Sequence, residues 1–240
     1  ALRDQTLNPH LVIVNGAHGG RTSAFWTDPT SASWNEVDAR LTSSRVTPAQ
    51  VQVAWIKLTQ PGPGDFPSKA LALQNDLAVI VRNLKINYPN VKIAYLSSRT
   101  RSYLVMRQGL SPEPAAYETG FAVKWLIAAH INGDAGLNYD LNRGPVVAPW
   151  LSWGPYLWID GMNPRSDGLT WSAQDLQADC VHPSASGIIK VAAMLMNFFK
   201  TDATTGWFRG DAPDPLETCA LPHQDVATPL NDLAETRLQE

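Results

Sequence analysis

The feature that most constrains this fold is a repeated order of elements: a short apolar run, a loop, and then a helical segment. Apolar runs of strand length fall at residues 11–15, 51–58 and 91–96, with a shorter one at 146–148. Strands that alternate with helices form βαβ units, which give a largely parallel sheet with helices on both faces. The sequence therefore predicts an α/β fold of three layers with a mainly parallel sheet.

The helix predicted over residues 68–87 has the clearest pattern. Ser68 opens it and Pro89 ends it, because a proline disfavours helical geometry in the residue before it. A shorter helix is predicted around residues 34–41, and another from about Glu113 to Asn132. The apolar face of the 68–87 helix consists of residues at helical spacing, namely Leu73, Leu77, Ile80, Val81 and Leu84.

Length and composition indicate a globular protein. The chain has 240 residues, of which 44% are hydrophobic and 17% charged, and its net charge of −3 gives no reason to expect nucleic acid or an anionic membrane as partner. No apolar run is long enough to span a membrane. We expect one α/β domain over residues 1–207 and an extended polar tail over 208–240.

The chain start and the two cysteines bear on processing and location. The sequence begins at Ala1 without an initiator Met or a signal peptide, which suggests a processed or truncated product. Cys180 and Cys219 are either both free or joined in one bridge. Few lysines with nine Trp and eighteen Pro favour the bridge, in a secreted or periplasmic protein. Their surroundings do not match a metal site, and no cofactor is implied.

Several loops that follow the predicted strands carry candidate binding residues. Three glycines in five residues, Gly16 to Gly20, either present amides to an oxyanion or form an ordinary turn. Arg99 and Arg101 either bind an anion or make salt bridges within a loop. The Trp-rich residues 145–158, with Trp150 and Trp153, either line a ligand site or pack. Ligands of parallel sheets bind at the carboxyl ends of strands, where these loops converge.

A short polar stretch precedes the last apolar segment of the chain. In it, Asp179 lies three residues before His182, which Pro183 and Ser184 follow. Pro183 keeps His182 out of helical geometry, and Ser184 is placed to cap an apolar helix that runs through Phe199. In so tight a turn the carboxylate can reach one imidazole nitrogen. The other nitrogen is then available as a base, although an Asp and a His at this spacing also occur by chance.

From about Leu11 to Phe199 the chain resembles the SGNH hydrolases, also called GDSL-type esterases and lipases. The most specific likeness is the Asp-x-x-His-Pro-Ser stretch that contains Asp179 and His182. The resemblance implies a flavodoxin-like SGNH hydrolase fold that lacks its first strand. It also implies that His182 is the general base, that Asp179 orients it, and that the amide of Gly20, or of Gly19, lines an oxyanion hole.

Two departures from the family pattern qualify this hypothesis. Where the family has an asparagine in its third block, the chain reads Lys57-Leu58-Thr59-Gln60, so Gln60 or Lys57 would have to donate. The nucleophilic serine of the family precedes the glycine loop, but residues 1–10 contain none. We expect that the serine was removed or is supplied by a separate N-terminal fragment, and that this chain alone is inactive on p-nitrophenyl acetate.

The function predicted from these residues is a serine-type ester hydrolase, a carboxylesterase or carbohydrate acyl esterase. Its substrate would be a small-molecule or carbohydrate ester that contacts Trp150, Trp153 and Arg99. The alternative is a non-catalytic carbohydrate-binding module on the same fold, which the missing serine block favours and the intact Asp179 and His182 pair disfavours. A metal-dependent hydrolase has little support because no ligand cluster is visible.

Overall fold

The structure is a computed structural model of the chain, and it describes residues 4–104 and 111–209. Its centre is a parallel sheet of three strands in the order β1-β2-β3, formed by Val53–Ile56, Ile93–Leu96 and Trp150–Trp153. In the register, Ile56 lies opposite Leu96, and Leu96 lies opposite Trp153. The predicted α/β class with a parallel sheet is confirmed.

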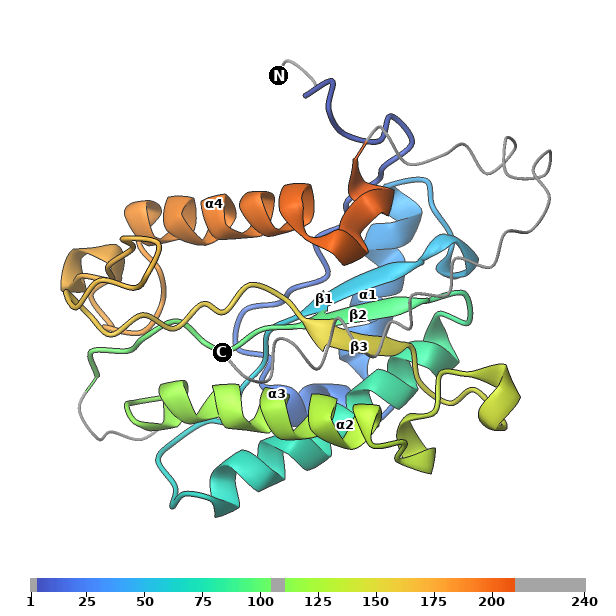
Figure 1. Cartoon of the computed structure of the whole chain (residues 1–240), viewed down its shortest axis with the longest axis horizontal. Helices are drawn as coiled ribbons and strands as arrows, with labels where there is room; N and C mark the ends of the chain where they lie inside the picture. Colours follow the sequence, from blue (N-terminus) through green and yellow to red (C-terminus); the bar gives the residue numbers. More distant parts are fainter. Residues whose placement is uncertain (1–3, 105–110, 210–240) are drawn as a thin grey trace.

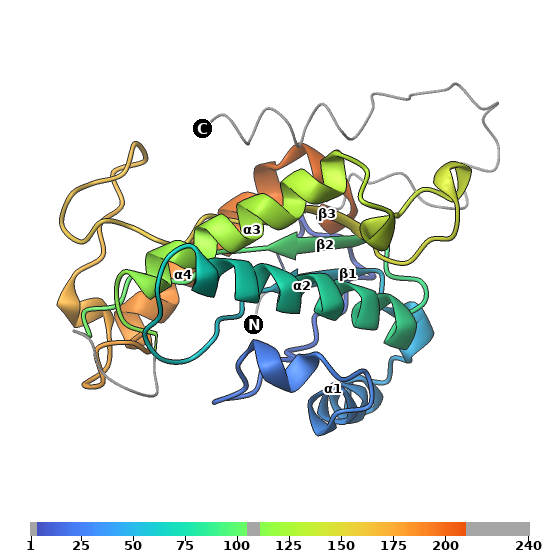
Figure 2. The ribbon, with the colours of Figure 1, turned by 90° about the horizontal axis from the view of Figure 1, so that it is seen from below.

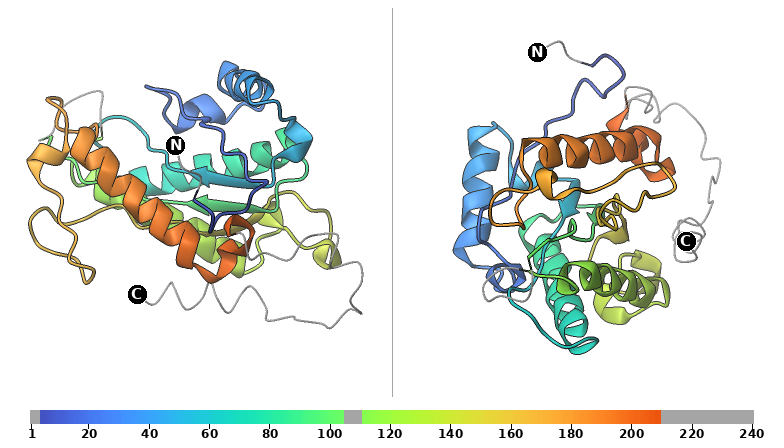
Figure 3. Two further views of the ribbon diagram at one scale, coloured as in Figure 1. Left: turned by 90° about the horizontal axis from the view of Figure 1, so that it is seen from above. Right: turned by 90° about the vertical axis from the view of Figure 1, so that its left-hand side faces the viewer.

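Helices cover both faces of this sheet. Helix α4 (Ala185–Thr201) lies across one face, and α2 (Ser68–Asn87) and α3 (Ala115–Ile131) lie across the other (Figures 1 and 2). Helix α1 (Ala32–Ser43) flanks α2 on the β1 side, as the end-on view of Figure 3 shows. Short 3-10 helices connect these elements: η1 (Ser23–Trp26), η2 (Pro48–Gln50), η3 (Ala135–Leu137), η4 (Leu141–Arg143), η5 (Ala173–Asp175) and η6 (Ala203–Phe208).

Alternating side chains of the strands fill two cores. Ala94 and Leu96 of β2 pack with α2 and α3 in the larger core, whereas Ile93 and Tyr95 pack with Phe198 of α4 on the opposite face. This alternation is the period of two that an extended strand requires. Helix α2 has the bounds predicted from the sequence, and all five of its predicted apolar residues are buried. Periodicity was sufficient there because one face of the helix is apolar along its whole length.

The strand predicted over residues 11–15 is wrong. These residues have no strand structure, and Val12 and Ile13 are 54% and 73% exposed. Val14 alone of this run packs against the larger core. An apolar run becomes a strand only when its backbone groups find a partner. In the described part of the chain, β1 pairs with β2 and has no second neighbour.

The strand predicted over residues 146–148 is misplaced by a few residues. The amides of Val147 and Ala148 both donate to the carbonyl of Asn138, at 2.8 and 3.2 Å, and so belong to a loop. Pairing with β2 begins only at Trp150, after Pro149, which has no amide to donate. The strand therefore occupies the Trp-rich stretch itself.

The two ends of the described chain lie together. Leu7 and Arg209 form an isolated antiparallel bridge, and Phe208 is buried at 2% exposure. The folded body thus extends through Arg209, and most of the predicted tail, residues 210–240, lies outside the described residues. No helix in the described ranges has the length and apolar character needed to cross a membrane.

Candidate functional site

Asp179 and His182 form a hydrogen-bonded pair on the turn that leads into α4. The Nδ1 atom of His182 lies 2.5 Å from Oδ2 of Asp179. The other carboxylate oxygen, Oδ1, accepts from the backbone amides of Val181 and His182 at 3.0 and 2.9 Å. One carboxylate thus holds both the backbone of the turn and the imidazole ring, as the spacing in the sequence predicted.

The electrostatics of the turn favour an ionised carboxylate. Partial burial by itself would raise the pKa of Asp179, but the amide and imidazole of His182 and the amide of Val181 outweigh it and lower the pKa to about 2. The side chain of His182 is 49% exposed. No described residue forms a hydrogen bond with its Nε2 atom, which leaves that nitrogen available to a substrate or nucleophile.

Hydrogen bonds to the segment after β2 fix the position of this turn. The carbonyl of Cys180 accepts from the amide of Tyr103 at 2.9 Å and from the hydroxyl of Ser102 at 3.2 Å. The amide of Gln177 donates to the carbonyl of His182 at 2.7 Å. The turn is therefore attached to the carboxyl end of β2, where a parallel sheet binds its ligands.

The start of α4 is packed tightly against the residues before the turn. Ser184 occupies the N-cap position, but its hydroxyl donates to the carbonyl of Gln174 at 2.8 Å instead of capping the helix. A Cβ on Gly187 would lie 2.1 Å from the carbonyl oxygen of Asp175, so only glycine fits there. The carboxylate of Asp175 also accepts from Lys190 of α4 at 2.7 Å. These contacts make the support of His182 rigid.

The glycine-rich loop is anchored to α1. His18 pairs with Glu36 at 2.5 Å, and Arg40 donates to the carbonyls of Asn15 and Ala17 at 2.8 and 2.5 Å. Gly20 has a φ of +76°, a conformation that glycine adopts without strain. Both Gly19 and Gly20 are exposed. Their conformation agrees with a sharp turn, and no ligand contact distinguishes the oxyanion interpretation from it.

Hydrogen bonds place this loop at the carboxyl end of β1. The amide of Ser23 donates to the carbonyl of Thr59 at 2.9 Å, three residues beyond β1. In the left view of Figure 3 the blue segment before η1 and the orange segment before α4 both extend toward this end of the sheet. No hydrogen bond joins the two segments among the described residues. The structure brings the glycine loop and the His182 turn to one end of the sheet, with no hydrogen bond between them among the described residues.

Gln60 uses one of its two amide N–H donors. Its Nε2 atom donates to Oδ2 of Asp76 at 3.0 Å, and Ser23 donates to the same oxygen at 2.6 Å. Thr59 and Gln60 line a small pocket with Glu118 and Thr119 of α3. The bond to Asp76 fixes the direction in which the second N–H of Gln60 can donate.

Arg99 and Lys57, both predicted from the sequence as candidate binding residues, follow the ends of β2 and β1. The guanidinium of Arg99 makes no hydrogen bond or ion pair with any described residue, and its Nε atom is buried. Burial lowers the pKa of Arg99. Burial, together with repulsion from Arg99, lowers the pKa of Lys57 to about 7. Arg101, in contrast, pairs with Asp160 at 2.6 Å.

The two tryptophans predicted to contact substrate lie in β3. Trp150 is 5% exposed and packs with Ile93, Tyr95 and Phe198, so its ring is part of the core beneath α4. Trp153 is partly buried against the larger core, and its ring lies 6.0 Å from that of Tyr156. The Trp-rich stretch therefore contributes chiefly to packing, which was the second of its two interpretations.

The predicted disulfide is not formed. Cys180 is a free cysteine, and Cys219 lies outside the described residues. Cys180 has a φ of +60°, which is uncommon for a residue other than glycine, and its carbonyl is the atom that ties the turn to Ser102 and Tyr103. Its role in the described structure is to shape the backbone that presents His182.

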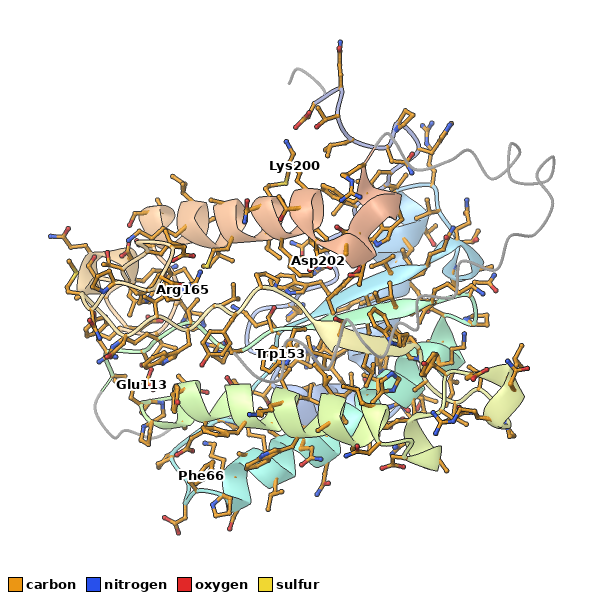
Figure 4. All side chains as sticks on the ribbon, viewed as in Figure 1. Phe66, Glu113, Trp153, Arg165, Lys200 and Asp202 are labelled. Carbon is orange, nitrogen blue, oxygen red and sulfur yellow. The ribbon has the colours of Figure 1, made fainter. Side chains whose placement is uncertain are left out.

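Glu113 is a structural residue of the site that sequence reasoning did not single out. One of its oxygens accepts from the amide of Ser102 at 2.9 Å and from the indole of Trp158 at 3.0 Å. Figure 4 shows it near the start of α3, at the same end of the molecule as Arg165. Its place just before a helix start was the available signal, because acids are favoured there.

No group of three or more metal-ligating side chains gathers in the part of the chain that the structure describes. Comparison with known proteins found no match among family models, curated proteins or solved structures. The chemistry of the site therefore has to be argued from the residues of this chain.

Proposed function

We propose that this chain belongs to a serine-type ester hydrolase with an SGNH-hydrolase-like fold. Its substrates would be carboxylic esters or acylated carbohydrates. The observation that carries the proposal is the 2.5 Å bond between Nδ1 of His182 and Asp179, together with an Nε2 atom that no described residue occupies. This arrangement matches the one in which an aspartate orients the histidine base of a Ser-His-Asp triad.

In the proposed reaction a serine attacks the acyl carbonyl, and Nε2 of His182 takes the serine proton. Asp179 holds the ring in one orientation and stabilises the imidazolium that forms. His182 then returns the proton to the departing alcohol. Water then attacks the acyl-enzyme while His182 takes a proton from it. His182 returns that proton to the serine oxygen as the carboxylic acid leaves. Backbone amides at Gly19 and Gly20 are the proposed donors to the oxyanion.

The proposed triad needs a nucleophilic serine in addition to His182 and Asp179. None of the described serines forms a hydrogen bond with His182, and residues 1–3, 105–110 and 210–240 contain no serine. We therefore place the nucleophile on a separate N-terminal fragment. Secretion or a periplasmic location also belongs to this proposal, together with a small-molecule or carbohydrate ester as the substrate.

A fluorophosphonate probe tests this function directly, because it reacts with activated serines. The protein as its gene encodes it should be labelled on one serine and should hydrolyse p-nitrophenyl acetate. His182→Ala should abolish labelling and lower kcat/KM about 10³-fold or more, while Lys124→Ala, at an exposed site on α3, should change neither. Labelling that persists in His182→Ala would refute the assignment of His182 as base.

A carbohydrate-binding module is the second candidate, and a row of aromatic rings on α3 favours it. Tyr117, Phe121 and Trp125 recur every four residues, and Phe66 lies 5.1 Å from Phe121. Phe66 and Tyr117 are 48% and 39% exposed. Aromatic faces of this kind pack against apolar ligand surfaces. Glycan binding that Phe66→Ala abolishes, with no serine labelled, would support this candidate over the hydrolase.

A further inference from the structure

Two cations at the carboxyl end of the sheet have no acidic partner among the described residues. Lys57 follows β1 directly, and Arg99 lies three residues beyond β2. Neither forms an ion pair, and neither side chain forms a hydrogen bond, with any residue in the described ranges. The other cations of this region differ: Arg101 pairs with Asp160 at 2.6 Å, and Lys190 pairs with Asp175 at 2.7 Å.

The strand register places Lys57 and Arg99 just beyond the paired ends of two neighbouring strands. Ile56 lies opposite Leu96, so Lys57 follows opposite Ser97, whose amide donates to the carbonyl of Ile56 at 3.0 Å. Arg99 is two residues beyond Ser97, after the end of β2. The charge of Arg99 is close enough to Lys57 to disfavour the protonated form of Lys57.

Such an arrangement is unfavourable unless an anion balances it. Both side chains are partly buried, and Nε of Arg99 is buried with no hydrogen-bond partner. Taking charged groups out of water without a partner raises the free energy of the folded state, and two like charges side by side raise it further. A guanidinium offers two parallel donors that match the oxygens of a carboxylate, sulfate or phosphate.

We propose that Lys57 and Arg99 form a binding site for a small oxyanion, the carboxylate, sulfate or phosphate group of a ligand. The site lies at the carboxyl ends of β1 and β2, where parallel sheets bind their ligands. The segment that contains Arg99 continues to Ser102 and Tyr103, which hold the carbonyl of Cys180. The anion site and the His182 turn therefore share one segment. The proposal does not depend on ester hydrolysis, because binding alone tests it.

The test compares thermal unfolding in sodium sulfate with that in sodium chloride at equal ionic strength and pH 6, below the pKa of about 7 of Lys57. Sulfate at ten times its dissociation constant should raise the Tm of the unsubstituted protein by about 3 to 6 °C relative to chloride. Lys57→Met and Arg99→Met, which keep most of the side-chain volume, should lose this shift. Lys124→Met removes an exposed cation from α3 and should keep it. Sodium phosphate and sodium acetate, run in the same way, identify which oxyanion binds best.

The same variants distinguish a ligand site from a structural one. In chloride, Lys57→Met should unfold at the same temperature as the unsubstituted protein or higher, because an unbalanced charge has been removed. A sulfate shift that survives in both variants, or one that is absent from the unsubstituted protein, would overturn the proposal. A lower Tm for Lys57→Met in chloride would also overturn it. If Arg99→Met does not fold, the Lys57→Met comparison decides by itself.

Discussion

His182 and His130 are two histidines with opposite surroundings. His130 lies on α3 with 2% exposure, and its Nδ1 atom bonds the carbonyl of Leu137 at 3.1 Å. Its Nε2 atom accepts from the amide of Leu151 in β3 at 3.3 Å. His182 is half exposed, with a carboxylate on Nδ1 and no described partner on Nε2. His130 is therefore held as a neutral ring, whereas His182 can exchange a proton with a ligand.

The difference shows what makes a histidine suitable for catalysis. Backbone groups on both nitrogens fix the tautomer and join α3 to β3, so that protonation of His130 would break a bond. Burial is the main reason that the pKa of His130 falls to about 4. A carboxylate on one nitrogen of His182 instead fixes the orientation of the ring, and no described residue bonds the other nitrogen. The following predictions test this contrast, beginning with the largest effect.

Replacing the carboxylate should disable His182 without unfolding the turn. In Asp179→Asn the amide oxygen can still accept from Val181 and His182, but the imidazole loses its charged partner. We expect kcat for ester hydrolysis by the protein as its gene encodes it to fall about 10³-fold or more. Asp65→Asn, at an exposed site, is the matched control and should retain full activity. Equal activity of Asp179→Asn and Asp65→Asn would refute the proposed role of Asp179 in orienting His182.

Removing the buried ring should affect stability instead of activity. His130→Ala leaves a cavity and two backbone groups without partners, so we expect unfolding free energy to fall by about 2 to 4 kcal/mol. His182→Ala, at an exposed position, should change it by less than about 0.5 kcal/mol. Urea unfolding of both variants measures the contrast. A larger loss for His182→Ala would mean that the turn, not the core, holds the fold together.

The pH dependence of stability should report His130. The unfolded chain takes up a proton on this residue near pH 6.5, but the folded protein resists protonation until about pH 4. This contribution to stability is therefore complete above pH 6.5 and is lost as the pH falls toward 4, by about 3 kcal/mol in total. Urea midpoints between pH 7 and 4 measure it, and His130→Gln should flatten the curve. An unchanged slope in that variant would show that other groups cause the loss.

Local patterns predicted the parts of the fold whose cause is local. Helix α2 needed only helical spacing and a terminating proline, and the Asp179–His182 bond needed only a tight turn before Pro183. The patterns failed where pairing matters. Val12 and Ile13 have the apolar character of a strand but pair with no strand of the described chain, and Val147 and Ala148 give their amides to Asn138 instead of to β2.

The sequence by itself determined the α/β class, the helix faces and the Asp179–His182 hydrogen bond, because each depends on residues that are neighbours along the chain. Tertiary structure decided which residues meet although they are distant from one another along the chain. It put Trp150 in the core and attached the turn of His182 to Ser102 and Tyr103. It also placed Lys57 near Arg99, and neither forms an ion pair within the part of the chain that the structure describes. Sequence spacing cannot supply these results, because they depend on strand register and on the burial that follows when layers pack.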